Sequence, residues 1–352
     1  MGLTAAALDA LGRDVAGPDY ALTSLDGPGV LSRYQPSSDD AIVGHRVISG
    51  RWVVKSKAPG ALVRQRLAAT YERFDPRLAD AQRALSPSLL DDCHTRELAI
   101  YAAPSPALRA IAPAIARIWR DDAAQIYVIV MERIAPRDHT WAPADLAGAL
   151  AGIARVHGEW LGRPPACVVP FAALHTPSLL AYEAALLRYN ADAFPDLFAT
   201  PRIRRLEALL ASAPDRWRAI AARPLGLIHG DLTPRNACVR RDGRFCAYDW
   251  ELAQAHLPAR DVVEWLCHLL DPAAGWRDPS TTALLAHYRG HLADALGATV
   301  TADELRHDLA LAAAELCTFK LLVQGITHQL LGDRRYFERM VANAFACLEG
   351  AP

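Results

Sequence analysis

The chain has 352 residues, 52% of them hydrophobic and 22% charged, which is typical of a soluble globular protein with one large domain or two lobes. Its formal net charge is -1, so composition gives no sign of a nucleic-acid partner. The sequence opens without a signal peptide and contains no apolar run long enough to cross a membrane, so we expect a cytoplasmic protein without a membrane partner.

The first part of the chain predicts a small antiparallel sheet. Three short runs at 29–35, 41–49 and 51–57 are rich in β-branched and aromatic residues, and turn signals separate them. A helical pattern follows from about 61 to 103, interrupted by two prolines. The run "QIYVIVMERI" at 125–134 then has the continuous apolar pattern of a buried strand.

Helical patterns dominate the second part of the chain. Residues 145–162 carry apolar side chains at helical spacing, with Asp145 as a candidate N-cap. His157 lies beside this apolar stripe, and we interpret it as a buried core histidine. Residues 302–331 also have a helical pattern.

This order of elements predicts an α+β protein with two lobes. A small β-rich lobe, ending in one connecting strand, is expected over residues 1–134. A larger, mainly helical lobe is expected over residues 135–352.

The stretch "LIHGDLTPRN" at 227–236 places His229, Asp231 and Asn236 directly after apolar residues. The spacing from aspartate to asparagine is that of the phosphoryl-transfer motif H-R-D-x-x-x-x-N, whose aspartate accepts the proton of the attacking hydroxyl. We therefore predict Asp231 as the catalytic base and expect His229 to brace the loop through a hydrogen bond. A capped turn without catalytic function is the alternative.

Residues 237–251 predict a β-hairpin around Asp242-Gly243. With a two-residue turn, Asn236 pairs with Asp249, and directly opposed residues have Cβ atoms about 4.5–5.5 Å apart. Magnesium prefers oxygen ligands and is usually bound by one or two carboxylates together with substrate phosphates. We therefore predict Asn236 and Asp249 as magnesium ligands in a nucleotide complex, with Glu251 as a further contact to metal or water.

Together with "AYDWE" (247–251) and "PARDVVEWL" (258–266), the motif resembles the aminoglycoside phosphotransferase and choline kinase superfamily, which shares the protein-kinase-like fold. The resemblance implies a bilobal fold, magnesium as cofactor and ATP or GTP as co-substrate. It also implies transfer of the γ-phosphoryl group to a hydroxyl of a small molecule, such as an antibiotic or a metabolite. Asp261 is then a structural residue that supports the catalytic loop.

The resemblance is looser in the β-rich lobe. "RWVVKSK" resembles the strand that carries the phosphate-binding lysine, so Lys55 is the candidate and Lys57, on the same face, is the alternative. "HTRELAIYAAPSPAL" resembles the helix whose glutamate pairs with this lysine. That makes Glu97 the candidate and Glu72 the alternative.

Two further nucleotide contacts follow from the resemblance. The backbone from Glu132 to Ile134, after the last strand, is expected to hydrogen-bond the purine. The glycine-rich loop that covers the phosphates in protein kinases is replaced by "PSSDD" (36–40), with Ser37 and Ser38 as candidate donors to phosphate.

The catalytic loop differs from the protein-kinase pattern at one position. Thr233 stands where protein kinases often carry a lysine toward the γ-phosphate. Arg235 is a candidate for that charge, with a surface position as the alternative. The only lysines of the chain are Lys55, Lys57 and Lys320.

The sequence defines the acceptor less closely. The helical lobe has acids and arginines in similar number, so it does not indicate a strongly acidic pocket for a polycationic aminoglycoside. A choline-like amine would require an aromatic cage around its ammonium group. Tryptophans are available for such a cage, although packing in the core would explain their presence equally well. These tryptophans are Trp250, Trp265 and Trp276.

The helix expected around 315–331 carries polar residues in an apolar background. We predict that at least one of Glu315, Gln324 and His328 lines the acceptor pocket, and a solvated stripe is the alternative. A pseudokinase that binds nucleotide without catalysis is the alternative of a different class. It usually lacks one of the required residue types, and this chain has all of them.

Overall fold

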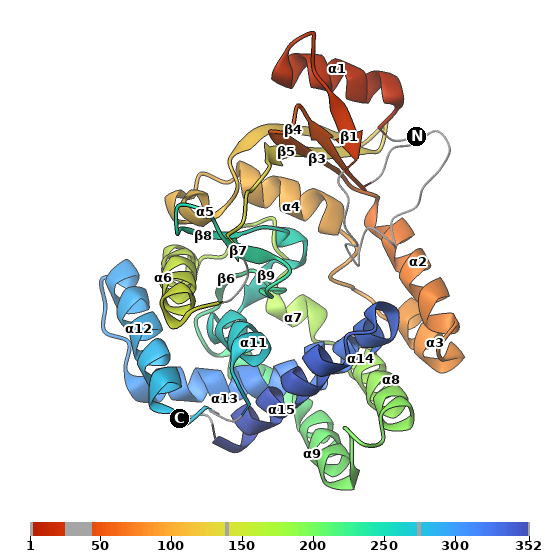
Figure 1. Ribbon diagram of the computed structural model, residues 1–352. Helices are drawn as coiled ribbons and strands as arrows, with labels where there is room; N and C mark the ends of the chain where they lie inside the picture. The colour runs from red at the N-terminus through yellow and green to blue at the C-terminus, as the bar shows by residue number, and fades with distance from the viewer. Residues whose placement is uncertain (1–2, 25–43, 138–140, 273–275, 351–352) are drawn as a thin grey trace.

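The computed structural model describes four stretches of the chain: residues 3–24, 44–137, 141–272 and 276–350. Figure 1 shows an upper part built around a sheet, above a larger helical part. The predicted strand at 29–35 and the predicted phosphate donors Ser37 and Ser38 lie outside the described residues.

The upper part contains an antiparallel five-stranded sheet with the order β1-β2-β3-β5-β4. Its strands are Leu22–Ser24 (β1), Gly44–Ile48 (β2), Trp52–Ser56 (β3), Ile115–Asp121 (β4) and Ile126–Glu132 (β5). The predicted runs 51–57 and 125–134, and the described part of the run 41–49, therefore contain strands, as expected.

Alternation along β3 decides which way its lysine points. Val54 packs with Val128 and Val130 of β5 in the cluster that includes residues of α1 (Ala5–Ala16). Because successive side chains of a strand point to opposite faces, Lys55 lies on the other face. That face is covered by α4 (Cys93–Ala102), whose Leu98 packs against the sheet.

The helical segment between β3 and β4 is divided as the prolines predict. It forms α2 (Gly60–Glu72), α3 (Pro76–Ala84), α4 and α5 (Pro106–Ile111). Proline is favoured at the first helical position because it lacks the N–H that would have no partner there. Although α2 and α3 fall within the first 134 residues, α3 packs against α8 (Pro177–Ala193), so this pair extends the helical part (Figure 1).

The rest of the helical part surrounds short strands. Its further helices are α6 (Pro143–Trp160), α7 (Phe171–Leu174), α9 (Thr200–Ala211), α10 (Ala213–Ala221), α11 (Ala259–Leu269), α12 (Pro279–Leu296), α13 (Ala302–Thr318), α14 (Lys320–Leu331) and α15 (Arg334–Gly350). Its strands are β6 (Gly226–Ile228), β7 (Ala237–Val239), β8 (Phe245–Ala247) and β9 (Gln254–His256). The tryptophans considered for an aromatic cage, Trp250, Trp265 and Trp276, are at most 2% exposed and belong to the core.

Two helix predictions need correction. Helix α6 begins at Pro143, so Asp145 is not the N-cap but the third helical residue, and its carboxylate accepts the N–H of Ala142 at 2.9 Å. The expected helix over 302–331 is broken at Phe319 into α13 and α14, which are bent by 42°. Within the described residues, no single helix is long and apolar enough to cross a membrane. Helices α13 and α14 have sufficient length and apolar composition only when they are taken together across the bend.

The hairpin after the catalytic motif is also one residue out of the predicted register. Ala237 faces Ala247 in the β7–β8 ladder, and the N–H of Tyr248 donates to the carbonyl of Asn236 at 2.9 Å. The turn has three residues, because Gly243 adopts a left-handed φ of 85° that continues the turn by one position. The predicted pairing of Asn236 with Asp249 is therefore wrong.

Candidate active site

A buried carboxylate holds the loop that follows β6. Asp261, in the first turn of α11, is 0% exposed and accepts the backbone N–H groups of His229 at 2.7 Å and Gly230 at 3.0 Å. Gly230 has a φ of 74°, and a Cβ there would lie 2.3 Å from the carbonyl oxygen of Leu252, so only glycine fits. His157, buried as predicted, contacts Asp261 through Nε2 at 3.2 Å.

The side chain of His229 ties the loop to the hairpin. Its Nε2 lies 2.9 Å from the carbonyl oxygen of Tyr248, and its ring packs on Trp250 with centroids 4.6 Å apart. The N–H of Asp231 points to Nδ1 of His229 at 3.3 Å. These contacts orient the backbone on both sides of Gly230 and thereby aim the Asp231 side chain.

Asp231 is held from two sides. Nδ2 of Asn236 donates to its Oδ2 at 2.6 Å, and the ammonium group of Lys320 contacts its Oδ1 at 2.5 Å. Burial raises the pKa of Asp231, but the charge of Lys320 outweighs burial and holds the pKa below its ordinary value. The carboxylate is thus ionised at neutral pH and can accept a proton.

Lys320 is a residue at this site that the sequence analysis did not assign to it. It begins α14 directly after the break at Phe319, is 6% exposed, and lies 3.4 Å from a carboxylate oxygen of Glu264. Arg235, the candidate for the charge in this place, is exposed and lies over the ring of Tyr336 at 4.9 Å. A signal was present, since lysine is so rare in this chain.

A network of ion pairs connects the sheet to the hairpin. Lys55 contacts Glu97 of α4 at 2.7 Å and Asp249 at 2.5 Å. Lys57 also contacts Glu97, and it contacts Glu251 at 2.6 Å. Both lysines thus share Glu97.

The alternative partner, Glu72, is exposed on α2 and pairs with Arg83 instead. Carboxylate oxygens of Glu97, Asp249 and Glu251 lie within 4.8 Å of one another, a spacing that suggests a metal site. Lys55 and Lys57 contact all three carboxylates, so ion pairs account for the cluster, although the two ammonium charges offset only two of the three carboxylate charges.

Asp249 reaches this network through an unusual backbone conformation. Its φ of 68° and ψ of 54° are left-handed, directly before the short 3-10 helix Trp250–Leu252. Burial raises the pKa of Asp249, but the charges of Lys55 and Lys57 outweigh burial and lower it far below its ordinary value. Because the Asp249 charge in turn raises the pKa of Asp231, the two carboxylates belong to one electrostatic site.

Oxygen ligands remain available in this site. Lys55 engages Oδ1 of Asp249, while Oδ2 has no protein partner among the described residues. Asn236 donates through its amide nitrogen to Asp231, so its side-chain carbonyl oxygen points elsewhere and stays free to bind a cation. A carboxylate and an amide oxygen are a donor set that suits magnesium.

The segment after β5 contains a backbone N–H group that could bind a ligand. The side chain of Glu132 accepts from Arg240 at 2.7 Å, so it faces the hairpin. The N–H of Arg133 donates to the carbonyl of Arg51 at 2.7 Å, whereas the N–H of Ile134 has no partner among the described residues. The predicted purine contact therefore rests on the backbone at 134.

A cavity of about 180 Å³ lies beside the Asp231–Lys320 pair. Its walls come mostly from apolar residues of α2, α8, α14 and the segment before α4, and its polar wall includes Glu315 and Lys320. Gln324 and His328 are not part of its lining, and His328 instead stacks on Phe337 with centroids 5.6 Å apart. The cavity faces the side of α14 that carries Val323, Ile326, Thr327 and Leu330, and Gln324 and His328 lie outside this side of the helix.

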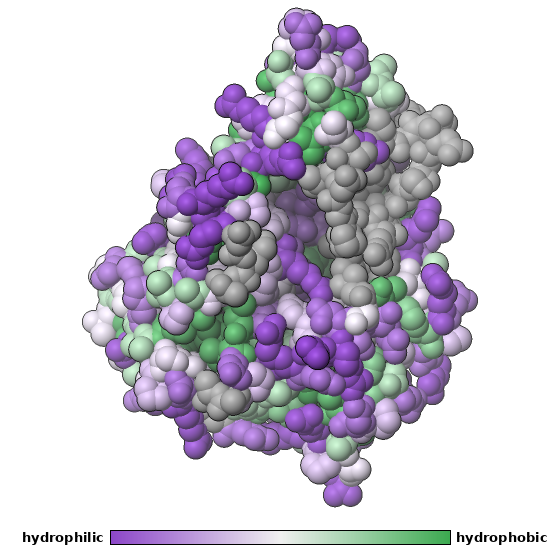
Figure 2. All heavy atoms as spheres, in the orientation of Figure 1, coloured by the Kyte–Doolittle hydropathy of each residue, from purple (hydrophilic) through white to green (hydrophobic). Residues whose placement is uncertain are grey.

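The surface view supports an opening between the two parts. The molecule is hollowed where the sheet-bearing part meets the helical part, and hydrophilic side chains gather below this hollow (Figure 2). Lys55 comes from the sheet-bearing part, and Asp231 and Asp249 come from the helical part on the other side of this junction.

In this site a buried lysine of the sheet pairs with a glutamate of a neighbouring helix, and both face an Asp–Asn pair in a loop. This is the arrangement found in kinases. The family model described as the phosphotransferase enzyme family matches residues 42–305. The chain therefore belongs to this family, and it is a phosphotransferase with an alcohol group as acceptor.

One solved structure has a similar kinase-like fold, and two further structures are more distantly similar. The choline kinase LicA from Streptococcus pneumoniae has a TM-score of 0.52 at 12% identity, with 97% of both chains covered. A choline/ethanolamine kinase family protein from Mesorhizobium loti has a TM-score of 0.46 at 17% identity, covering 97% of this chain and 95% of that one. An aminoglycoside phosphotransferase from Alicyclobacillus acidocaldarius has a TM-score of 0.45 at 16% identity, covering 92% of each. Comparison with curated protein sequences finds no match.

Proposed function

We propose that the protein transfers the γ-phosphoryl group of ATP or GTP to a hydroxyl group of a small molecule, an antibiotic or a metabolite, with Asp231 as the catalytic base. The observation that carries this proposal is the setting of Asp231. Its carboxylate is ionised, oriented by Asn236 and Lys320, and shares one electrostatic site with Asp249.

The reaction forms a bond between the acceptor oxygen and the γ-phosphorus. The bond from that phosphorus to the β–γ bridging oxygen breaks, and the nucleoside diphosphate leaves. The hydroxyl proton passes to Asp231, which later releases it to solvent. Because the transition state is loose, positioning and charge neutralisation contribute more than covalent assistance.

Asp249 and Asn236 are the residues that would hold magnesium, and the ion would neutralise charge on the phosphates. Lys55 keeps Asp249 ionised and fixes its orientation through the 2.5 Å contact. Lys55 is therefore our preferred phosphate-binding lysine, with Lys57 as a second cation behind it that shares Glu97.

Lys320 supplies the charge that the catalytic loop lacks. Thr233, which is buried, offers no cation, whereas the Lys320 ammonium group lies against Asp231. We assign Lys320 to two tasks. It orients Asp231 in the resting enzyme, and it stabilises negative charge on the phosphoryl group during transfer.

The alternative of a pseudokinase makes a different demand on Asp231. A pseudokinase would tolerate the loss of Asp231, yet Asp261, His229, Asn236 and Lys320 all hold this side chain or its loop in place. Four residues that position one carboxylate favour a catalytic function over a non-catalytic one.

The experiment is a nucleotide-consumption screen with product mass detection. The panel contains aminoglycosides, macrolides, choline-like amines, sugars and hydroxy amino acids, each tested with ATP and with GTP. We expect at least one acceptor to be phosphorylated by the wild type and not by Asp231→Asn. A product formed equally by both proteins would refute the assignment of the base.

A further inference from the structure

The cavity beside Lys320 has the size and surface for a compact apolar molecule. Its volume is about 180 Å³, and the side chains of Val63, Leu67, Leu179, Val323 and Leu330 are among its lining. A dry apolar cavity of about 150 Å³ accommodates benzene. A body of about six to eight carbons therefore fits this space.

A chain of ion pairs leads from the cavity to the catalytic base. Arg260 donates to Glu264 at 3.2 Å, Glu264 lies 3.4 Å from Lys320, and Lys320 contacts Asp231 at 2.5 Å. Arg260 and Lys320 both line the cavity. One end of a bound molecule thus lies next to Lys320, which contacts the base.

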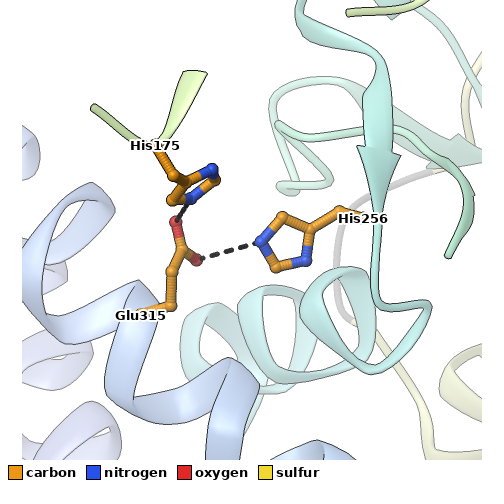
Figure 3. Close-up of side chains that lie close together, drawn as sticks. All are labelled: His175, His256 and Glu315. Carbon is orange, nitrogen blue, oxygen red and sulfur yellow. Dashed lines mark ion pairs between the residues drawn. The ribbon is translucent and has the colours of Figure 1, made fainter. Parts of the chain in front are cut away.

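Three polar side chains lie together at one side of the cavity without hydrogen bonds to one another. Figure 3 shows His175 and His256 pointing at the two carboxylate oxygens of Glu315, each at 3.9 Å. This is too long for a hydrogen bond. Nε2 of each histidine is buried and has no hydrogen-bond partner in the described part of the chain, and His175 and Glu315 line the cavity, whereas His256 lies behind that lining. We call these three residues the polar socket.

Backbone contacts decide which proton each histidine carries. Nδ1 of His175 lies 2.7 Å from the carbonyl of Phe171 and must donate, which leaves the Nε2 of the neutral ring as an acceptor. Nδ1 of His256 accepts the N–H of Leu257 at 2.8 Å, so its Nε2 carries the proton and is a donor. Burial lowers the pKa of His256 to about 3, so this ring stays neutral.

The socket fits an oxygen atom better than a metal ion. Nε2 of each histidine lies 3.9 Å from a carboxylate oxygen of Glu315. A metal held at about 2.0–2.1 Å requires three ligands within about 3.6 Å of one another, whereas an oxygen at hydrogen-bonding distance of about 2.8 Å matches the wider triangle. A protonated Nε2 on His256 also cannot bind a metal.

A hydroxyl group can pair with the donor of the socket and with one of its two acceptors at the same time. It accepts the proton of His256 Nε2 and donates its own to His175 Nε2 or to the Glu315 carboxylate. Oε2 of Glu315 already accepts from Arg260 at 2.5 Å, so Glu315 is charge-compensated and gives little attraction to a cation. The charged groups that line the cavity, Arg260, Glu315 and Lys320, are each part of an ion pair, so this wall offers no unpaired carboxylate to a polycationic or quaternary ammonium acceptor.

We propose that this cavity is the acceptor site and that it takes an uncharged, mainly apolar alcohol whose second hydroxyl group binds between His175, His256 and Glu315. The proposal rests on the proposed kinase function for the fate of the first hydroxyl, which must reach Asp231. The second hydroxyl then sets the orientation of the molecule along the cavity.

The experiment compares isosteric probes. Para-xylylene glycol and its meta isomer carry two hydroxyl groups, and para-ethylbenzyl alcohol has the same shape with only one. Kanamycin and choline are the charged comparisons. Binding is measured by calorimetry and phosphorylation by product mass, each with the wild type and with Asp231→Asn.

We expect at least one glycol isomer to bind about tenfold more tightly than the mono-alcohol, the scale of one hydrogen bond in a buried site. His256→Asn keeps an acceptor for the Leu257 N–H but removes the Nε2 donor, so it should abolish this preference. His175→Asn, which keeps the contact to Phe171, provides the same test if His256→Asn does not fold. His94→Asn is the matched control, because Nδ1 of His94 also accepts a backbone N–H, from Gly60 at 3.1 Å.

Val323→Phe should weaken both probes alike, since it fills the cavity without touching the socket. Equal binding of glycol and mono-alcohol means that a buried water occupies the socket and overturns the proposal. Tighter binding or faster phosphorylation of kanamycin or choline overturns it as well. Glycol binding that persists in Asp231→Asn while no acceptor is phosphorylated by the wild type refutes the kinase proposal and supports this ligand class.

Discussion

The ion-pair network at the sheet and the cavity beside α14 are both buried, yet they are built from opposite chemistry. The network places Lys55, Lys57, Glu97, Asp249 and Glu251 in direct contact. The cavity wall is mostly apolar, with its charges gathered at one side.

The difference separates the residues needed for any phosphoryl transfer from those that select the acceptor. Burying charges carries a desolvation cost that their attraction scarcely offsets, so a network like this one is retained for function more than for stability. Phosphoryl transfer requires such charges whatever the acceptor is. The cavity contributes shape and a few polar contacts, which are what distinguish one acceptor from another.

Asp231→Asn should give the largest effect and leave both regions intact. We expect kcat to fall by about 10²- to 10⁴-fold, because the asparagine cannot accept the hydroxyl proton. Nucleotide affinity should be nearly unchanged. Steady-state kinetics and nucleotide titration measure this, and Asp242→Asn, in the exposed hairpin turn, is the control. Near-normal turnover of Asp231→Asn would show that another group is the base.

Asp249→Ala should break the charged region alone. We expect magnesium-dependent nucleotide affinity to fall by about 10²-fold, with a smaller loss for Asn236→Ala, because the carboxylate is the stronger ligand. Titration of magnesium against nucleotide binding measures both. Glu72→Ala, on the exposed face of α2, should behave as the wild type. Unchanged metal dependence in both site variants would refute the shared magnesium site.

Lys320→Met tests the residue that joins the two regions. We expect kcat to fall by about tenfold, the effect of losing a charge-assisted hydrogen bond of about 1.5 kcal/mol. The pH profile should change too. In the wild type the lysine holds the pKa of Asp231 below its ordinary value, so the base stays ionised as the pH falls.

Without Lys320, burial and the Asp249 charge both raise the pKa of Asp231. The acidic limb of kcat/KM should therefore move to higher pH in Lys320→Met. Rate measurements from neutral to acidic pH decide this. A limb that stays in place would mean that Lys320 does not act on Asp231.

Arg235→Ala should have the smallest effect and sharpens the assignment of Lys320. Arg235 is exposed and rests on Tyr336, so we expect kcat and the nucleotide KM to stay within about twofold of the wild type. A loss of kcat as large as that of Lys320→Met would instead indicate that Arg235 is the cation that stabilises the phosphoryl group.

The sequence by itself determined the elements and residues that depend on local pattern. The strand with Lys55, the proline-started helices, and the order of Asp231, Asn236, Asp249 and Asp261 along the chain all follow from short-range spacing. Local patterns identify such features because hydrophobic periodicity and turn residues act within a few positions.

Only the tertiary structure decided which distant groups meet. A left-handed Gly243 shifted the hairpin by one residue, so Asp249 reaches Lys55 through its own left-handed backbone and not through strand pairing. The break at Phe319 brought Lys320 to Asp231, 89 residues away, and Gln324 and His328 fell outside the cavity lining. Neither contact has a sequence signature, because each depends on the packing of helices far apart in the chain.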